Sequence, residues 1–280
     1  MPFSVMLLVL LGASLHATWN GLVKSGKDKY LDTVAVLTGA ALLTLLWLPF
    51  LPLPARASWS YLAASTLIHE LYFILIALSY RQGEMSLVYP LTRGAAPALT
   101  ALCSVAVVGE RPSQNGWIGV FLVSSGVLLL AFDHSRGGGF KIAPVMLALA
   151  NSAVVALYTL ADGIGVRLSG NAFGYTGWGF LLCALLFAPA AIVIRKHAAL
   201  RHFKTVWLRS LTGGACSIAA YSLALWAMTR APIASVAALR ETSIIFGVLI
   251  AAYTLNERVT RMRVAAAALV VAGAILIKVA

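Results

Sequence analysis

The sequence predicts an all-α integral membrane protein in which ten transmembrane helices form two inverted five-helix repeats around a central cavity. Three observations lead to this prediction. Hydrophobic residues make up 61% of the 280 residues and charged residues only 11%, whereas soluble domains carry roughly 25% charged residues. Long apolar windows recur along the whole chain, and its two halves align with each other at a fixed offset.

The expected spans are apolar windows of about 20 residues, the length that crosses a hydrocarbon core of roughly 30 Å. Charged residues or Gly and Pro bound each window. Hydrocarbon offers backbone groups no partners, and the windows are too long and too evenly apolar for barrel strands, so helices are expected. The spans are placed at Phe3–Lys24, Thr33–Leu51, Trp59–Tyr80, Met85–Val108, Asn115–Phe132, Ile142–Gly163, Tyr175–Ile194, Leu208–Met228, Pro232–Leu255 and Val264–Val279.

The first span has no Lys or Arg before it, so it lacks the charged region of a cleavable signal peptide and is expected to be retained. The three cysteines, Cys103, Cys183 and Cys216, fall inside apolar windows without paired spacing. They are interpreted as small core residues and not as a disulfide or metal framework.

An internal repeat appears when the sequence is shifted by 147 positions. It predicts a first repeat at 1–132, a connecting segment at 133–141 and a second repeat at 142–280. The offset aligns Arg93 with Arg240, Glu110-Arg111 with Glu257-Arg258, Gly126 with Gly273, and Ala77-Leu78 with Ala224-Leu225.

Each repeat holds an odd number of spans, so the second must be inverted relative to the first. Two inverted halves can exchange conformations and expose one midplane site alternately to each side of the membrane. The alternative is that the duplication only doubles the fold, without alternating access.

The net charge of +12 has its origin in short loops and not in one basic stripe, so nucleic-acid binding is not expected. Of the 21 Lys and Arg residues, 14 lie on the side of the loops after odd-numbered spans and five on the other side, while Arg93 and Arg240 lie inside spans. Since Lys and Arg accumulate in cytoplasmic loops, both termini are expected outside the cytoplasm.

A five-plus-five duplication with Gly109-Glu110-Arg111 and Asn256-Glu257-Arg258 closing the fourth span of each half resembles the drug/metabolite transporter superfamily, EamA type. The stretch from Leu15 to Asn20 (LHATWN) and Lys24 are similar to a subgroup of that family. The resemblance covers essentially the whole chain. It implies a bundle with a central cavity, often serving export of amino acids or related metabolites in bacteria, without ATP hydrolysis. Many members have cytoplasmic termini, contrary to the charge count.

Ionisable side chains at bilayer depth cost roughly 2.5–3.5 kcal/mol each on insertion scales, which makes them candidates for function. Arg93 and Arg240 occupy equivalent positions and could hold a carboxylate in a bidentate fork, while Glu70 or Glu241 holds an ammonium group. That arrangement describes an amino-acid site. The alternative is that these charges pair with one another, for instance Glu70 with Arg93, and serve packing or gating.

Polar and aromatic residues at helical spacing extend this candidate site along several spans. Asn151 and Asp162 in the sixth span are weaker candidates and stand outside the predicted set. The predicted substrate-binding residues are His16, Trp19, Asn20, His69, Glu70, Tyr72, Tyr89, Arg93, Tyr158, Tyr221, Trp226, Arg240 and Glu241.

The favoured function is a secondary transporter of the bacterial inner membrane that exports or exchanges small metabolites, amino acids first, by alternating access. The alternative is a proton-coupled carrier for multidrug or lipophilic-cation efflux, with Glu70 alternating between proton and drug. Motifs of nucleophilic, metal or nucleotide chemistry are missing, so neither an enzyme nor a cofactor is expected. The expected partners are the solute, the lipid bilayer and, for a proton-coupled cycle, protons; the oligomeric state is left open.

Overall fold

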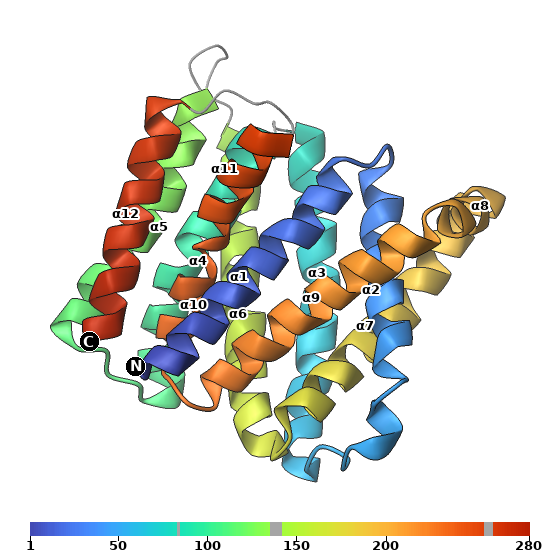
Figure 1. The fold of residues 1–280 in the computed structure, drawn as a ribbon, viewed down its shortest axis with the longest axis horizontal. Helices are drawn as coiled ribbons and strands as arrows, with labels where there is room; N and C mark the ends of the chain where they lie inside the picture. Colours follow the sequence, from blue (N-terminus) through green and yellow to red (C-terminus); the bar gives the residue numbers. More distant parts are fainter. Residues whose placement is uncertain (83–84, 135–141, 255–259) are drawn as a thin grey trace.

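The computed structural model describes residues 1–82, 85–134, 142–254 and 260–280, and these residues contain helices but no strands (Figure 1). The predicted connecting segment therefore lies almost entirely outside the described residues, as do Glu257 and Arg258. The helices are α1 (Phe3–Lys24), α2 (Lys29–Thr44), η1 (Leu48–Phe50), α3 (Arg56–Gln82), α4 (Met85–Val108), α5 (Gln114–His134), α6 (Ile142–Ser169), α7 (Ala172–Arg195), α8 (His197–Thr205), α9 (Trp207–Met228), α10 (Ile233–Arg240), α11 (Ser243–Thr254) and α12 (Arg261–Val279).

The membrane-spanning character of the bundle follows from length and hydropathy. Within the described residues, nine helical segments are long and apolar enough to cross a bilayer, and α5 adds a shorter apolar stretch, Gln114–Leu130. Large apolar side chains face outward, such as Phe50 at 84% and Val193 at 74% exposure, as expected for a surface in contact with lipid. The predicted all-α fold of ten transmembrane helices is confirmed.

Several boundaries differ from the sequence prediction. The second span is shorter as an α-helix, because α2 ends at Thr44 and a single 3₁₀ turn follows. The sixth span is longer, since α6 continues six residues beyond Gly163 to Ser169. Helix α8 was not predicted, because its basic residues read as a loop between two spans.

The predicted ninth span is two helices and not one. The chain leaves the α10 helix at Glu241 and Thr242, whose backbone N–H groups bond to the carbonyls of Ala238 and Leu239 in a tight turn before α11 begins. Neither Gly nor Pro marks this break in the sequence. A discontinuous helix at bilayer depth is tolerated where it is buried in protein or borders a cavity.

The two halves pack against each other through equivalent helices. The first helix of each half packs on the third helix of the other, so that α1 contacts α9 and α6 contacts α3. The self-equivalent pairs α5 with α12 and α2 with α7 also pack together. Both termini lie near each other at the same end of the bundle (Figure 1). This reciprocal packing is the arrangement expected of two inverted repeats.

Glycines set the close approach of helices from the two halves. A Cβ at Gly39 on α2 would lie 2.2 Å from the Ser210 carbonyl oxygen on α9, and one at Gly214 would lie 2.4 Å from the backbone nitrogen of Ala40. Gly119 and Gly273 bring α5 and α12 together in the same way. Because no hydrophobic effect drives helices together in lipid, backbone contact of this kind supplies much of the packing.

Candidate functional site

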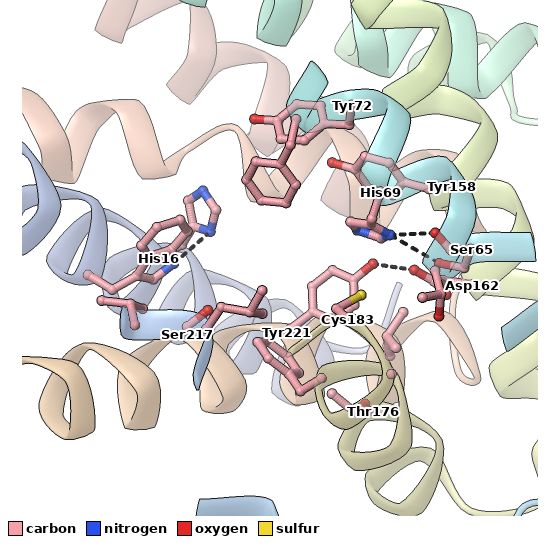
Figure 2. A pocket seen from close by; sticks show the side chains of 18 of the residues that line it. His16, Ser65, His69, Tyr72, Tyr158, Asp162, Thr176, Cys183, Ser217 and Tyr221 are labelled. Carbon is pink, nitrogen blue, oxygen red and sulfur yellow. Dashed lines mark hydrogen bonds between the residues drawn. The ribbon is translucent and has the colours of Figure 1, made fainter. Parts of the chain in front are cut away.

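A central cavity of about 170 Å³ lies between the halves. Its wall comes from α1, α2, α3, α4, α6, α7, α9 and α10, so both repeats contribute. Figure 2 shows His16 on one side of this space and His69, Tyr158, Tyr221 and Asp162 on the other. The predicted residues that line it are His16, Trp19, Asn20, His69, Tyr72, Tyr89, Arg93, Tyr158, Tyr221 and Arg240.

The other three predicted residues, Glu70, Trp226 and Glu241, do not line this cavity. Glu70 is half-buried on α3, and its Oε1 atom has no hydrogen-bond partner among the described residues. Trp226 packs against the apolar core, with the Arg230 guanidinium 5.1 Å from its ring centroid. Glu241 is buried beside the cavity wall, where it is bonded to Arg93.

Arg93 and Glu241 form a forked ion pair between α4 and the turn after α10. Arg93 Nε donates to Glu241 Oε2 at 3.2 Å, and Arg93 Nη2 donates to Oε1 at 2.5 Å. The residues are 6% and 3% exposed. A buried charge is tolerated when it is paired and hydrogen-bonded, so this pair joins the two halves with little net charge at the centre. The pairing considered from sequence, Glu70 with Arg93, is not the one formed.

Arg240 has different surroundings from its sequence equivalent. Its guanidinium carbon lies 5.1 Å from the centroid of the Tyr221 ring, within the range of a cation–π contact. It forms no ion pair with any carboxylate in the described part of the chain. Arg240 also ends α10, where the carbonyl groups of a helix terminus favour a positive charge. A guanidinium therefore lines the cavity without a carboxylate bonded to it in the described part of the chain.

Asp162 is the acidic residue among the described residues that line the cavity, and the predicted set lacks it. It is 3% exposed on α6 and lines the cavity. The Tyr175 hydroxyl donates to its Oδ1 at 3.1 Å, and the Tyr221 hydroxyl donates to its Oδ2. The sequence signals were its ionisable side chain inside the predicted sixth span and its spacing of four residues from Tyr158, which places both on one face of α6.

Aromatic rings form the rest of the wall near Asp162. His69 stacks on Tyr158 with ring centroids 4.1 Å apart, and Tyr72 meets Tyr158 edge to face at 6.0 Å. His69 Nδ1 lies 2.8 Å from the backbone carbonyl oxygen of Ser65 and 3.2 Å from its hydroxyl oxygen. These hydrogen bonds hold the His69 ring against α3, the helix that carries both residues. On the opposite side, Trp19 Nε1 donates to His16 Nδ1 at 3.3 Å. The cavity thus combines a few fixed polar groups with a largely aromatic surface, a composition typical of small-molecule sites.

Comparisons with known proteins agree with this architecture. Residues 142–279 match the EamA-like transporter family. A solved structure titled "Crystal structure of protein" covers 99% of this chain and 96% of its own, with a TM-score of 0.76 at 18% identity. That likeness concerns the fold alone. The comparison with curated proteins found no match.

The EamA-like match indicates a multi-pass membrane transporter of the drug/metabolite transporter type, with a small-molecule substrate. It agrees with the resemblance seen in the sequence at the level of the superfamily. The EamA-like family is typically non-enzymatic. The amino-acid subtype, the membrane in question and the binding roles of individual residues stay predictions.

At one end of the bundle, Glu110, Arg167 and the first turn of α10 form a cluster of polar bonds between the halves, called the latch below. Arg167 Nη2 donates to Glu110 Oε1 at 2.7 Å and to the Ala231 carbonyl at 3.0 Å. Glu110 also accepts from the Ile233 backbone N–H at 2.9 Å, so it caps α10. The neighbouring Gly116 lies near the C-terminal residue, which puts the latch at the end of the bundle that carries both termini.

Proposed function

We propose that the chain is a secondary transporter of the bacterial inner membrane that exports or exchanges small zwitterionic metabolites, amino acids first, by alternating access. One observation carries the choice of solute. Arg240 lines the central cavity and lacks a carboxylate partner among the described residues, whereas the guanidinium of Arg93 is matched by Glu241. A carboxylate-bearing solute supplies the missing counterion.

The two equivalent arginines have different roles: Arg93 is structural and Arg240 binds the solute. Arg93 and Glu241 satisfy each other in a forked pair that tethers the halves. Arg240 binds the solute carboxylate, because guanidinium groups bind carboxylates in a planar, two-bond geometry. The Tyr221 ring beneath it holds the guanidinium in place and shields it from solvent.

Alternating access is supported by the way the halves meet. The latch joins Glu110 of the predicted first repeat, 1–132, to Arg167 and Ile233 of the second, 142–280, at the end of the bundle that carries the termini. Other polar bonds between the halves, His202 with Asp32 and Arg209 with Ser25, lie away from this latch. The bonds of the latch are polar, and the Arg167 side chain is 31% exposed, so water can replace part of them when the halves separate. Opening the latch is the step that would expose the cavity on the side of the termini.

The efflux of lipophilic cations is less well supported. The cation carrier proposed from sequence uses Glu70 to exchange proton for drug, and Glu70 does not line the cavity; the acidic residue that does line it is Asp162, in the same cavity as the positive charge of Arg240. An unpaired Arg240 repels a cationic solute. The volume of about 170 Å³ is also below the roughly 300–1,000 Å³ of pockets for drug-sized ligands.

The test is counterflow in proteoliposomes, with purified protein and a panel of amino acids and lipophilic cations. Trapped unlabelled amino acid should drive uptake of the labelled amino acid, as it does for a carrier and not for a channel. Arg240→Gln should abolish counterflow, while Arg230→Gln should leave it unchanged. Arg230 is the matched control, because it also stacks at 5.1 Å on an aromatic ring, Trp226, but lies outside the cavity.

Two results would overturn the proposal. Counterflow of lipophilic cations without any amino acid would favour the alternative carrier. Amino-acid counterflow that survives Arg240→Gln unchanged would remove the carboxylate role from Arg240.

A further inference from the structure

We infer that Asp162, held by Tyr175 and Tyr221, binds the ammonium group of the solute and thereby sets its specificity for zwitterions. This inference rests on the proposed function and assigns the residue that binds the positively charged end of the solute in the same cavity. The two residues proposed from sequence for this role are not available for it, since Glu241 is bonded to Arg93 and Glu70 does not line the cavity.

The carboxylate of Asp162 is buried but incompletely satisfied. Its residue is 3% exposed and lines the cavity. Each oxygen accepts one hydroxyl hydrogen bond, from Tyr175 and from Tyr221. A carboxylate has about four acceptor positions, so about two remain for a further donor. In the described ranges no Lys, Arg or His forms an ion pair with it.

An ammonium group suits these surroundings better than other donors. It carries a full positive charge and three N–H donors in a compact head. One N–H can bond to the carboxylate, and the others can bond to lone pairs of the two tyrosine hydroxyl groups. Since a buried charge without a counterion is costly, the positive solute group gains most of its attraction from neutralising Asp162.

Tyr221 contacts both charged groups, Arg240 through its ring and Asp162 through its hydroxyl. Arg240 lies over its ring at 5.1 Å, and Asp162 accepts from its hydroxyl. The guanidinium carbon and the carboxylate are therefore within about 11 Å of each other. The head group of an α-amino acid, with one charge-assisted hydrogen bond at each end, spans roughly 9 Å. A solute of this span can reach both charged groups if their separation is near that upper limit, as the proposed site requires.

The charge balance selects the zwitterion. Arg93 and Glu241 cancel, which leaves one positive and one negative group, Arg240 and Asp162, facing the cavity. A solute with only a carboxylate leaves Asp162 without a counterion, and one with only an ammonium group leaves Arg240 without one. Each mismatch buries a charge without a partner, which is the strongest penalty available to such a site.

The experiment compares two competitors of amino-acid counterflow for wild type and for Asp162→Asn. The first competitor is the unlabelled amino acid, and the second is the same molecule with hydrogen in place of the ammonium group. Wild type should prefer the amino acid at least tenfold. Asp162→Asn should lose that preference, through weaker competition by the amino acid with little change for the analogue. Asp162→Glu, which keeps the charge, should keep the preference.

A purely structural role for Asp162 gives a different result. The aspartate would then only tie α6 to α7 and α9, and Asp162→Asn would weaken both competitors equally with the preference intact. That outcome, or equal competition by both molecules in wild type, overturns the inference while leaving amino-acid transport in place. If wild type transports no amino acid at all, the proposed function fails and the inference fails with it.

Should Asp162→Asn not fold, Tyr175→Phe provides a second test. It removes one of the two hydrogen bonds to the carboxylate and keeps the charge. The amino acid should still be preferred over the analogue, and the affinity for it should change several-fold. Loss of the preference in this variant would contradict a charge-based ammonium site.

Discussion

Breaking the Arg93–Glu241 pair should destabilise the protein far more than removing the pair altogether. Glu241→Gln leaves the Arg93 guanidinium buried without its counterion, and Arg93→Gln does the same to the carboxylate. Because both residues are less than 7% exposed, each single variant should cost about 3–5 kcal/mol of unfolding free energy. The double variant replaces the pair by two amides that can bond to each other, and it should recover at least about 2 kcal/mol of the summed loss.

The assay is reversible unfolding in mixed detergent micelles, followed by the fluorescence of the seven tryptophans. The four proteins of the double-mutant cycle give the coupling free energy directly. Arg240→Gln serves as the comparison, since it removes a charge that has no counterion and should cost much less stability. The double variant should also retain amino-acid counterflow, because Arg240 is intact.

Additive losses in the cycle would show that the two side chains do not stabilise each other and would refute the structural role of the pair. Loss of counterflow in a well-folded double variant would indicate that Arg93 binds the substrate, as predicted from the sequence.

Three further predictions concern packing and orientation. Gly39→Val should lower the free energy of unfolding by at least about 2 kcal/mol, because the new Cβ would lie 2.2 Å from the Ser210 carbonyl oxygen. Gly247→Ala is the control, since its new Cβ would have no atom within 4 Å, and it should leave thermal stability in detergent unchanged. Ser152→Ala removes a hydrogen bond of 2.9 Å to the Thr92 carbonyl and should lower the free energy of unfolding by only about 0.6 kcal/mol. A loss of several kcal/mol in the unfolding assay would contradict this prediction. A fluorescent reporter at the C-terminus that is active only in the cytoplasm should stay dark, and a bright reporter would overturn the charge-based topology.

The helical bundle could be predicted from sequence because lipid leaves few options. The bounds of α1 and α4 agree with the apolar windows to the residue, since charges or glycines follow directly at Ser25–Lys29 and Gly109. The break at Glu241 could not be predicted, because it depends on burial against α4 and not on a helix-breaking residue.

The site could be predicted only in part, because the repeat is asymmetric at its centre. The 147-residue offset identified Arg93 and Arg240 as equivalents but implied equal roles. The residue after Arg240 is Glu241, whereas the residue after Arg93 is Gly94, which packs closely against Leu128. One carboxylate is therefore available for two arginines, and which of them it joins depends on the three-dimensional packing.

Asp162 illustrates the same limit. The sequence made Asp162 only a weaker candidate, because the two tyrosines that donate hydrogen bonds to it lie on other helices, α7 and α9. Contacts of this kind join residues 13 and 59 positions apart, and no local pattern encodes them.

Alternating access is tested most directly by labelling a cysteine in the cavity from each side of the membrane. Ser217→Cys, in a variant without Cys103, Cys183 and Cys216, places one thiol on the cavity wall. A membrane-impermeant thiol reagent should reach it from both sides, and adding Glu110→Gln, which weakens the latch, should speed labelling from the side of the termini and slow it from the other side. Labelling from one side only, or rates that rise on both sides together, would contradict a carrier that exposes its cavity alternately.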